Sequence, residues 1–310
     1  MTTFSPINRI EHPIFSHHNI DVVIKRDDLI HSVISGNKWR KLKHNLIYAK
    51  ANDFKGVLSF GGAYSNHIHA LAFACFQQGL SSIGIIRGEQ HYANNCTLMA
   101  AQQWGMQLKF VDRSTYKLRG DSEYLSTLQK TYPNYLIVPE GGSNALALPG
   151  VGDVINELSL QCKFDTLIVP TGSGGTIAGL IKADKNVHEI IGIAVLKQAD
   201  YLVSEINSLI GDCAHHFNNW RLLTDYHRGG YAKFTETDLK RIQAFSLETN
   251  IPFEPIYSGK MLLAFLDLVE QGHFPSGHKV VLLHTGGLQG IGGMLERGKL
   301  DKDTWKVPLL

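Results

Sequence analysis

The feature that most constrains the fold of this chain is a repeated alternation of short β-rich runs with longer stretches of helical spacing. The β-rich runs are GVLSF (56–60), SSIGIIR (81–87), LKFVD (108–112), YLIVPEGG (135–142), DTLIVPTGSGG (165–175), EIIGIAVL (189–196) and KVVLLHTGG (279–287). Between them, residues 66–78 and 94–104 have the length and apolar spacing of helices. This order predicts parallel sheets that carry helices on both faces, the pattern of an α/β protein.

Composition and charge narrow the functional classes. Apolar residues make up 44% of the 310 residues, and the formal net charge is +2. These values argue against disorder, a basic nucleic-acid surface and a polybasic membrane patch. The opening stretch MTTFSPINRIEHPIF has no apolar core of signal-peptide length, and no later segment stays apolar for about 18 residues. We therefore expect a cytoplasmic enzyme for a small molecule, with neither nucleic acid nor membrane as partner.

The four cysteines give no sign of a disulfide or a metal. Cys75, Cys96, Cys162 and Cys213 are far apart, and the chain has no C-x-x-C and no paired His/Cys spacing. We predict reduced, mostly buried thiols and no metal site.

Glycine-rich turns follow three of the predicted strands: SFGGAYSNH (59–67), VPEGGSN (138–144) and VPTGSGGT (169–176). In open α/β sheets, ligands bind at the carboxyl ends of strands, where a starting helix offers free backbone N–H groups to an anion. These turns are therefore the candidate ligand-binding loops.

The turn TGSGGT (171–176) suits one terminal phosphate. Its glycines let the backbone approach a phosphate closely, and Thr171, Ser173 and Thr176 add hydroxyl donors. It lacks the third glycine of a dinucleotide fingerprint, the Gly-Lys-Ser/Thr ending of a Walker loop and the first glycine of a serine-hydrolase elbow. A purely structural tight turn remains the alternative.

Polar residues elsewhere are open to two interpretations. Ser65 and Asn66 either bond a bound ligand or cap the helix that follows them. Lys38, in SGNKWRKL (35–42), either belongs to a basic helix face or does the chemistry. The late loops YSGK (257–260) and HTGG (284–287) add further hydroxyl groups. Each of these signals is weak by itself.

Taken in order along the chain, SGNKWRKL, GGAYSNH, TGSGGT, YSGK and HTGG resemble the pyridoxal-phosphate enzymes of the tryptophan-synthase-β fold. They are most similar to the branch that contains 1-aminocyclopropane-1-carboxylate deaminase and D-cysteine desulfhydrase. The resemblance runs from about residue 24 to residue 287. It implies an α/β fold of two parallel-sheet domains, fold type II, with a smaller domain at 50–147 inserted into a larger one formed by 1–49 and 148–310.

The resemblance also implies roles for single residues. Lys38 would carry pyridoxal 5'-phosphate as a Schiff base. Lysine suits this task because its neutral amine attacks aldehydes once desolvation or nearby cations lower its pKa. Ser65 would meet the carboxylate of a small amino-acid substrate, Asn66 the phenolic oxygen of the cofactor, and Lys41 would add a charge near the phosphate. The phosphate itself would lie among Gly172, Ser173, Gly174, Gly175 and Thr176.

Two tyrosines complete the implied site. Tyr231 and Tyr257 stand where the family has active-site tyrosines that face the substrate. A packing role with the hydroxyl tied down is the alternative for each. The surroundings of the first, YHRGGYAKF, differ from those usual in the family.

The residues implied near the pyridine nitrogen choose between the two activities. A carboxylate there favours a protonated ring and a deep electron sink, whereas a hydroxyl leaves the nitrogen largely neutral. The deaminases have glutamate after the late tyrosine and an apolar residue in the H-T-G-G loop, where this chain has Ser258 and Thr285. Loss of thiolate needs a weaker sink than opening a cyclopropane. The resemblance therefore implies D-cysteine desulfhydrase-like β-elimination to pyruvate, ammonia and sulfide.

Several alternatives stay open. One is 1-aminocyclopropane-1-carboxylate deaminase, which would give 2-oxobutyrate and ammonia. Serine/threonine dehydratases and cysteine synthases share the lysine and the phosphate loop, but the S-N-H turn and the late tyrosine loop argue against them. A non-catalytic protein that binds the cofactor would be expected to lose Lys38 or the tyrosines. Family members are commonly homodimers, so the resemblance implies a homodimer.

Overall fold

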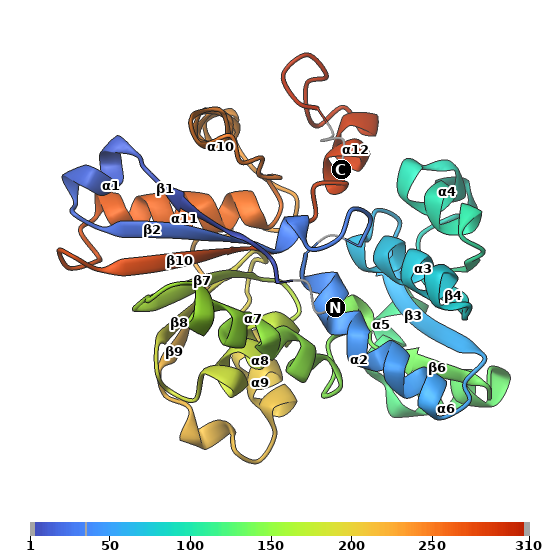
Figure 1. Ribbon diagram of the computed structural model, residues 1–310. Helices are drawn as coiled ribbons and strands as arrows, with labels where there is room; N and C mark the ends of the chain where they lie inside the picture. Colours follow the sequence, from blue (N-terminus) through green and yellow to red (C-terminus); the bar gives the residue numbers. More distant parts are fainter. Residues whose placement is uncertain (1–3, 35, 307–310) are drawn as a thin grey trace. The chain divides into compact units, whose positions relative to one another are not determined.

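The computed structural model describes residues 4–34 and 36–306 (Figure 1). It divides into two compact units, which we call the large unit and the small unit. The large unit comprises Met1–Ile30, Ser35–Asn37 and Val151–Leu288, and the small unit comprises His31–Ile34, Lys38–Gly150 and Gln289–Leu310. The division predicted above, with 50–147 inserted into 1–49 and 148–310, stays a prediction.

The large unit contains a six-stranded sheet in the order β1-β2-β10-β7-β8-β9. Neighbouring strands are parallel, except that β1 is antiparallel to β2. The strands are β1 (Ile7–Ile10), β2 (Asp21–Arg26), β7 (Thr166–Thr171), β8 (Glu189–Ala194), β9 (Trp220–Leu223) and β10 (Lys279–His284). β7, β8 and β10 lie in predicted β-rich runs, whereas β1, β2 and β9 are additional to the predicted strands.

Helices cover both faces of this sheet, as Figure 1 shows. The connections from β2 to β7, β7 to β8 and β8 to β9 run in one direction across the sheet, so right-handed crossovers place α7, α8 and α9 on one face. The return from β9 to β10 places α10 and α11 on the other. The helices are α1 (Pro13–His17), α7 (Ala147–Gln161), α8 (Gly175–Asp184), α9 (Tyr201–Ile210), α10 (Glu236–Thr249) and α11 (Ser258–Glu270), with one-turn 3₁₀ helices η1 (Asp27–Leu29) and η5 (Ala214–His216).

Strand β2 buries charged side chains that its sequence would suggest are exposed. The Lys25 side chain is fully buried, and its Nζ donates to Glu157 Oε2 and to the Ser5 carbonyl, both at 2.6 Å, and to Gln161 Oε1 at 2.7 Å. A buried ammonium needs such partners because its desolvation is otherwise very unfavourable. The contacts join β2 to α7 on one face of the sheet.

The small unit contains a four-stranded parallel sheet in the order β5-β4-β3-β6. One apolar core packs α2, α3 and α4 on one face, and another packs α5 and α6 on the other. The strands are β3 (Gly56–Gly62), β4 (Ser81–Arg87), β5 (Gln107–Val111) and β6 (Tyr135–Val138). The helices are α2 (Asn37–Ala51), α3 (Asn66–Gln78), α4 (Cys96–Gln103), α5 (Arg113–Lys117), α6 (Ser122–Thr131) and α12 (Gly290–Glu296), with 3₁₀ helices η2 (Gln90–Asn94), η3 (Leu118–Gly120) and η4 (Glu140–Gly142).

In each sheet, the glycine-rich turns lie at neighbouring strand ends. The turns 171–176 and 284–287 follow β7 and β10, which pair in parallel in the large unit. The turns 61–67 and 139–144 follow β3 and β6, which pair in parallel in the small unit. In both sheets the direction of the connections reverses between these two strands, and ligands of open α/β sheets bind at such points.

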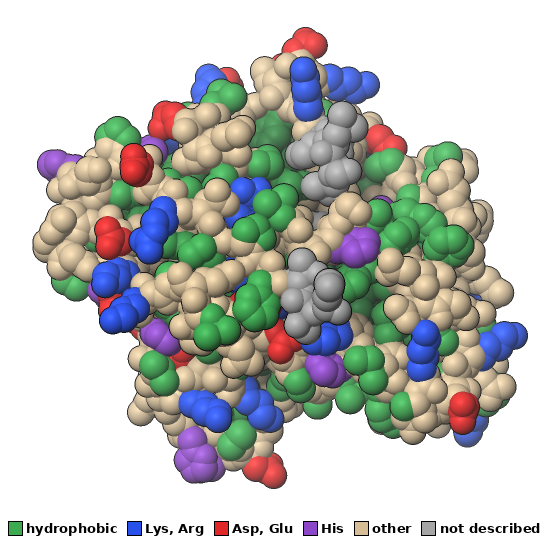
Figure 2. Space-filling view, in the orientation of Figure 1, with side chains coloured by type: hydrophobic (Ala, Val, Ile, Leu, Met, Phe, Trp, Pro, Cys, Tyr) green, Lys and Arg blue, Asp and Glu red, His purple; other side chains and the backbone are tan. Residues whose placement is uncertain are grey.

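Two expectations from composition can be compared with the structure. All four cysteines are free thiols, and Cys75 is buried, whereas Cys96 is exposed. Over the described residues visible in Figure 2, basic and acidic side chains are interspersed and form no broad patch of one sign. No helix in the described part of the chain is both long and apolar enough to span a bilayer.

Candidate active site

The turn TGSGGT leads into α8 with its backbone N–H groups uncapped. Gly174 is the N-cap, has φ +73° in the left-handed region, and provides no side-chain hydrogen bond. The N–H groups of the first helical turn have no partners inside a helix. Together with the helix dipole, they make an anion-binding site of the kind that takes a phosphate.

Gly172 of the same turn lies beneath a tyrosine ring. A Cβ at Gly172 would be 3.0 Å from Cε1 of Tyr257, a contact that only glycine avoids without movement. The ring of Tyr257 in turn packs edge to face with that of Tyr231, with centroids 5.9 Å apart. Tyr231 is 47% exposed, so it is not a buried packing residue. The large unit thus brings the phosphate-type turn and both predicted tyrosines together.

The residues just before Lys38 contact two of the predicted loops. The Asn37 backbone N–H donates to the Thr285 carbonyl at 3.2 Å, and Asn37 Nδ2 donates to Thr176 Oγ1 at 2.8 Å. Gly36, at φ +71°, has no room for a side chain, because a Cβ would lie 1.8 Å from the Thr285 carbonyl oxygen. Ser35, the first residue of the SGNK motif, lies outside the described residues. Asn37 is a site residue that the motif contained and the sequence argument did not single out.

Lys38 and Lys41 lie in the first turns of α2. Lys38 is half-buried and Lys41 is 2% exposed. Lys41 Nζ donates to the Gly141 carbonyl at 3.2 Å and to Ser143 Oγ at 3.0 Å. Burial, and secondly the charge of Lys38, lower the pKa of Lys41 well below its ordinary value. Lys38 therefore lies close enough to repel the ammonium form of Lys41, which adds to burial in favouring a neutral amine at Lys41.

A neutral histidine lies beside these lysines. His67 Nε2 is 2.7 Å from Ser59 Oγ, whose one hydrogen is donated to the Val138 carbonyl at 2.7 Å. His67 therefore donates from Nε2, and its buried Nδ1 lone pair has no partner among the described residues. Burial, followed by Lys38 and Lys41, lowers the pKa of His67 well below 6.5. The S-N-H spelling of the turn was the only sequence signal for this residue.

Ser65 and Asn66 begin α3. Ser65 is the N-cap, and its Oγ accepts from the Ile68 N–H at 3.3 Å, so the capping interpretation of Ser65 is confirmed. Its hydroxyl hydrogen can still be donated to a ligand. Asn66 is half-buried, and its side-chain amide makes no hydrogen bond within the part of the chain that the structure describes. Its amide is therefore available to a ligand.

Ser258 lies above a buried carboxylate that the sequence argument missed. The Glu254 carboxylate accepts from the backbone N–H groups of Ile256 at 2.6 Å, Tyr257 at 2.9 Å and Ser258 at 2.6 Å. Ser258 Oγ is fully buried and donates to Glu254 Oε1 at 3.0 Å. Burial outweighs these hydrogen bonds and raises the pKa of Glu254 to about 7.

Thr285 follows β10 in a loop shaped by a buried histidine. His284 Nδ1 accepts from the Gly286 N–H at 3.2 Å, while Gly286 and Gly287 have φ of +75° and +91°. Within the described residues, the Thr285 hydroxyl has no hydrogen bond, in contrast to that of Ser258. Of the two predicted hydroxyls, Thr285 therefore has the one that is available.

These features fit pyridoxal phosphate. The large unit has an uncapped helix N-terminus for a phosphate, a free hydroxyl at Thr285 and two aromatic hydroxyls at Tyr231 and Tyr257. In the small unit, Lys38 and Lys41 lie together at the start of α2, and the side-chain amide of Asn66 makes no hydrogen bond within the described residues. Such a set suits a phosphorylated aldehyde better than a nucleotide, because the chain lacks the corresponding nucleotide motifs.

The fold has parallel α/β sheets, a helix N-terminus suited to one phosphate and two adjacent lysines. These features are typical of a cofactor-dependent enzyme. The family model described as "Pyridoxal-phosphate dependent enzyme" matches residues 4–286. The chain therefore belongs to the family of pyridoxal-phosphate dependent enzymes, and pyridoxal phosphate is its cofactor.

Named relatives narrow the comparison. A Pyrococcus horikoshii protein, provisionally named 1-aminocyclopropane-1-carboxylate deaminase, is 31% identical over 87% of this chain and 85% of its own length. The bifunctional D-cysteine desulfhydrase/1-aminocyclopropane-1-carboxylate deaminase of Arabidopsis thaliana mitochondria is 29% identical over 93% of this chain and 77% of its own. A crystal structure described as an ACC deaminase homologue covers 94% of this chain and 92% of its own, with TM-score 0.82 and 28% identity. The predicted family and fold are confirmed.

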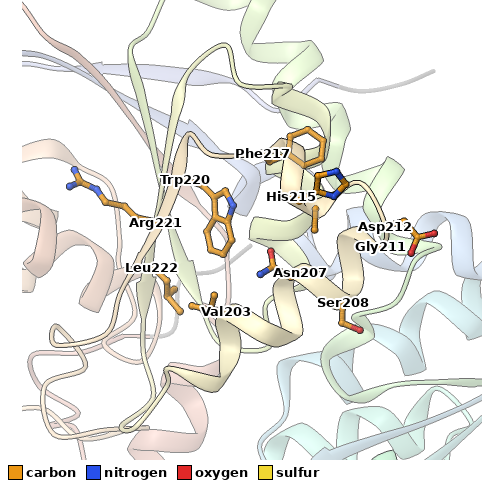
Figure 3. Close-up of a pocket in the computed structure, with 11 residues that line it drawn as sticks. Val203, Asn207, Ser208, Gly211, Asp212, His215, Phe217, Trp220, Arg221 and Leu222 are labelled. Atoms are coloured by element: carbon orange, nitrogen blue, oxygen red, sulfur yellow. The ribbon is translucent and has the colours of Figure 1, made fainter.

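An open depression elsewhere in the large unit does not involve the predicted site (Figure 3). It has a volume of about 860 Å³ and lies beside α9, η5 and the edge strand β9. It is lined by Val203, Asn207, Ser208, Gly211, Asp212, Ala214, His215, Phe217, Trp220, Arg221 and Leu222. None of the predicted site residues lines it.

Proposed function

We propose that this chain catalyses β-elimination from a small D-amino acid, with D-cysteine as the substrate that yields pyruvate, ammonia and sulfide. The family establishes the cofactor, and the lysine pair at the start of α2, the anion-binding helix start and the facing tyrosines support a lyase. We further propose the residues predicted above as its site. The choice of reaction depends on the group that meets the pyridine nitrogen.

Each proposed residue has a contact or a charge that supports its role. The N–H groups of α8 and the loop Gly172, Ser173, Gly174, Gly175 and Thr176 would hold the phosphate. Lys41, whose neutral form burial and Lys38 favour, would take up a proton beside the phosphate and so add positive charge near it. Asn66 would donate its amide to the phenolic oxygen, and Ser65 would donate its hydroxyl to the substrate carboxylate.

When bound, pyridoxal phosphate supplies the electron sink for charge that develops at the substrate α-carbon. Lys38 would hold the cofactor, and its amine would serve as the base that accepts the α-proton of the substrate. Burial, and secondly the charge of Lys38, favour a neutral amine at the neighbouring Lys41. Tyr257 and Tyr231 would orient the β-substituent, and either hydroxyl can give a proton to the leaving thiolate.

The observation that carries the choice of reaction is the pair of hydroxyl residues at positions 258 and 285. Ser258 donates its hydrogen to Glu254, so that only its oxygen lone pairs remain available. The Thr285 hydroxyl has no such commitment among the described residues and can donate to an unprotonated ring nitrogen. A neutral ring is the weaker sink, which is sufficient for loss of thiolate.

A second candidate is the opening of 1-aminocyclopropane-1-carboxylate to 2-oxobutyrate and ammonia. The names of the Pyrococcus and Arabidopsis relatives favour it. The two reactions can be separated by their products in one series of assays.

Purified protein should therefore be assayed with D-cysteine, L-cysteine, D-serine, β-chloro-D-alanine and the cyclopropane amino acid. We expect pyruvate and sulfide from D-cysteine and little or no 2-oxobutyrate. Thr285→Val, which keeps the shape of the side chain but removes the hydroxyl, tests the role of Thr285. It should change the cofactor absorbance as well as the rate. Strong 2-oxobutyrate formation without sulfide would contradict the proposal.

The role of Lys38 has its own test. Borohydride reduction followed by peptide mapping should find the cofactor attached to Lys38, and Lys38→Ala should abolish turnover. Lys41→Ala is the control, because it removes a neighbouring amine and should leave the attachment site unchanged. Cofactor on another lysine would contradict the assignment.

We also propose a cytoplasmic homodimer, on the family resemblance and on the four free thiols. Sedimentation equilibrium of the purified protein tests the dimer. A monomer at all concentrations would contradict it.

A further inference from the structure

The loop that carries Tyr231 has an unusual backbone. Arg228, Gly229, Gly230 and Ala232 have φ of +51°, +90°, +109° and +52°. Two of these are not glycine, and a left-handed conformation at such residues costs free energy and persists only where surrounding contacts hold it. We call residues 228–232 the Tyr231 loop.

A buried lysine on α11 holds this loop. Lys260 is 1% exposed, and its Nζ donates to the Gly230 carbonyl at 2.5 Å and to the Val195 carbonyl at 3.2 Å. Gly230 directly precedes Tyr231, and Val195 directly follows β8. Lys260 also stands one helical turn after Tyr257, whose ring contacts that of Tyr231. One turn of α11 therefore supports both tyrosines.

The loop has a second connection to α11 in Arg228, which donates to Asp267. Arg241 of α10 also binds Asp267, at 2.7 Å. This ion pair fixes the start of the loop, three residues before Tyr231. Within the described residues, the Gly230 carbonyl accepts from Lys260 Nζ and from the Lys233 N–H at 3.1 Å, and the Gly230 N–H donates to the His227 carbonyl at 3.0 Å. Of these three contacts, the one from Lys260 ties the loop to α11.

The charge on Lys260 matters because both of its acceptors are neutral carbonyls. A hydrogen bond from an ammonium is roughly twice as strong as one between neutral groups. The charged groups that act on Lys260 are Glu254 before α11 and Asp238 on α10, which favour the ammonium, and Arg228 in the loop, which disfavours it. Burial is the largest influence and lowers the pKa of Lys260 to about 8.

We propose that Lys260 is a positioning residue that holds Tyr231 through the Gly230 carbonyl, firmly while its amine is protonated and loosely once the proton is lost. The consequence for turnover rests on the proposed role of Tyr231 at the substrate. The proposal that protonated Lys260 holds the loop does not depend on the function of Tyr231.

Trypsin cleavage can measure how firmly the Tyr231 loop is held, because trypsin cleaves after Arg228 and after Lys233. Holoenzyme is digested in its native state between pH 7 and 9, and the cleavage rates are divided by those of the free peptide YHRGGYAKF (226–234) at each pH. This division removes the pH dependence of the protease. The normalised rate of the wild type should rise as the pH passes through about 8.

Lys260→Met keeps the length of the side chain but cannot donate to the carbonyls. Its normalised cleavage at pH 7 should be at least about tenfold faster than in the wild type, a factor that corresponds to about 1.4 kcal/mol, and should not change with pH. Lys240→Met is the matched control, since Lys240 is an exposed lysine on α10 and should leave cleavage unchanged. Wild-type cleavage in Lys260→Met would overturn the proposal.

Global unfolding cannot produce the expected result, because it exposes Lys260 to water, whereas release of the Tyr231 loop leaves Lys260 buried on α11 without its Gly230 acceptor, which lowers its pKa further. Lys260 releases its proton more readily when folded than when unfolded, where its pKa is near 10.5. Its contribution therefore makes the folded state more stable as the pH rises from about 8 to 10.5. Should Lys260→Met fail to fold, the wild-type series still decides, because a normalised rate that stays flat from pH 7 to 9 overturns the proposal.

Kinetics connect the loop to the reaction. If Lys260 acts through Tyr231, Tyr231→Phe should lower kcat/KM for D-cysteine in the wild type but have little further effect in Lys260→Met. Equal losses in both backgrounds would overturn the positioning role. Absence of turnover in the wild type would instead contradict the proposed function, while the cleavage series would still decide whether Lys260 holds the loop.

Discussion

Two helices of the large unit begin at similar glycine-containing turns and satisfy their first N–H groups in opposite ways. At α8 the N-cap is Gly174, which has no side chain to accept a hydrogen bond. At α11 the carboxylate of Glu254 accepts from three successive backbone N–H groups and from the Ser258 hydroxyl. The first helix start leaves its positive end for an external anion, whereas the second is already occupied by an internal carboxyl group.

The difference shows why a glycine turn before a helix is not by itself a ligand site. TGSGGT and YSGK look alike as short polar loops, yet among the described residues Glu254 accepts the N–H groups at the second, whereas no N-cap side chain does so at α8. A helix N-terminus attracts an anion through its unpaired donors and its dipole, and a buried carboxylate uses up both. The following substitutions test this difference between the two helix starts.

The largest expected effect comes from giving α8 an internal anion of its own. Gly174→Asp places a carboxylate at the N-cap, and Gly174→Asn is the control, since both residues tolerate a positive φ and share the same contact with Ile206. Two like charges about 4 Å apart repel by about 4 kcal/mol at an effective dielectric of 20. Gly174→Asp should therefore bind pyridoxal phosphate about a thousandfold more weakly than Gly174→Asn.

Equilibrium dialysis of cofactor-free protein measures this difference. A Lys38→Ala background removes the covalent contribution, so that only contacts around the phosphate and ring remain. Equal affinity in the two Gly174 variants would show that no anion binds at α8.

The next effect concerns the internal anion at α11. The folded state keeps a proton on Glu254 up to about pH 7, whereas the ordinary pKa is 4.5. The stability contributed by this group is thus fully present below about pH 4.5 and is lost as the pH rises through about 7. Relative to Glu254→Gln, which does not titrate, the wild type should lose on the order of 2–3 kcal/mol across this window.

Urea unfolding at several pH values between 4.5 and 7.5 gives both free-energy curves. Glu205→Gln, at an exposed position of α9, is the control and should follow the wild type. Parallel curves for the wild type and Glu254→Gln would mean that Glu254 does not change its protonation in this range.

The smallest effect is expected from Ser258→Ala. It removes one buried hydrogen bond to Glu254 but leaves the three backbone donors, so it should lower the free energy of unfolding by about 1 kcal/mol. The affinity of α8 for inorganic phosphate should stay the same, because no group at α8 is changed. Thermal unfolding and phosphate titration of one preparation measure both. A loss of phosphate affinity would show that the two helix starts are coupled.

Much of the fold could be predicted from sequence because most strands have a local signature. β3, β4, β7, β8 and β10 are apolar runs that end in turn residues, and α3 has the predicted bounds. β2 was not predicted because two adjacent charged residues, Lys25 and Arg26, follow its three apolar residues and suggest an exposed segment. The buried contacts of Lys25 with Glu157 and Gln161 explain how the strand lies inside the sheet.

The residues of the candidate site also differ in whether the sequence alone could point to them. Lys38 and TGSGGT could be found because the motifs are short and their chemistry depends on residue type. Glu254, Lys260 and His67 could not, because an isolated acidic or basic residue looks like a surface charge until its burial is known. The cap role of Ser65 was foreseen as an alternative, since capping depends on local spacing.

The α/β class, the family and its cofactor could be predicted from sequence alone, because strand periodicity, glycine turns and the order of motifs are properties of short segments. The tertiary structure decided which helix start remains open to an anion, which hydroxyl keeps a free hydrogen and which lysine holds the Tyr231 loop. Those outcomes depend on burial and on partners distant in the chain, such as Gly230 and Val195 for Lys260. Only packing sets the desolvation that moves the pKa of Glu254 upward and that of Lys260 downward.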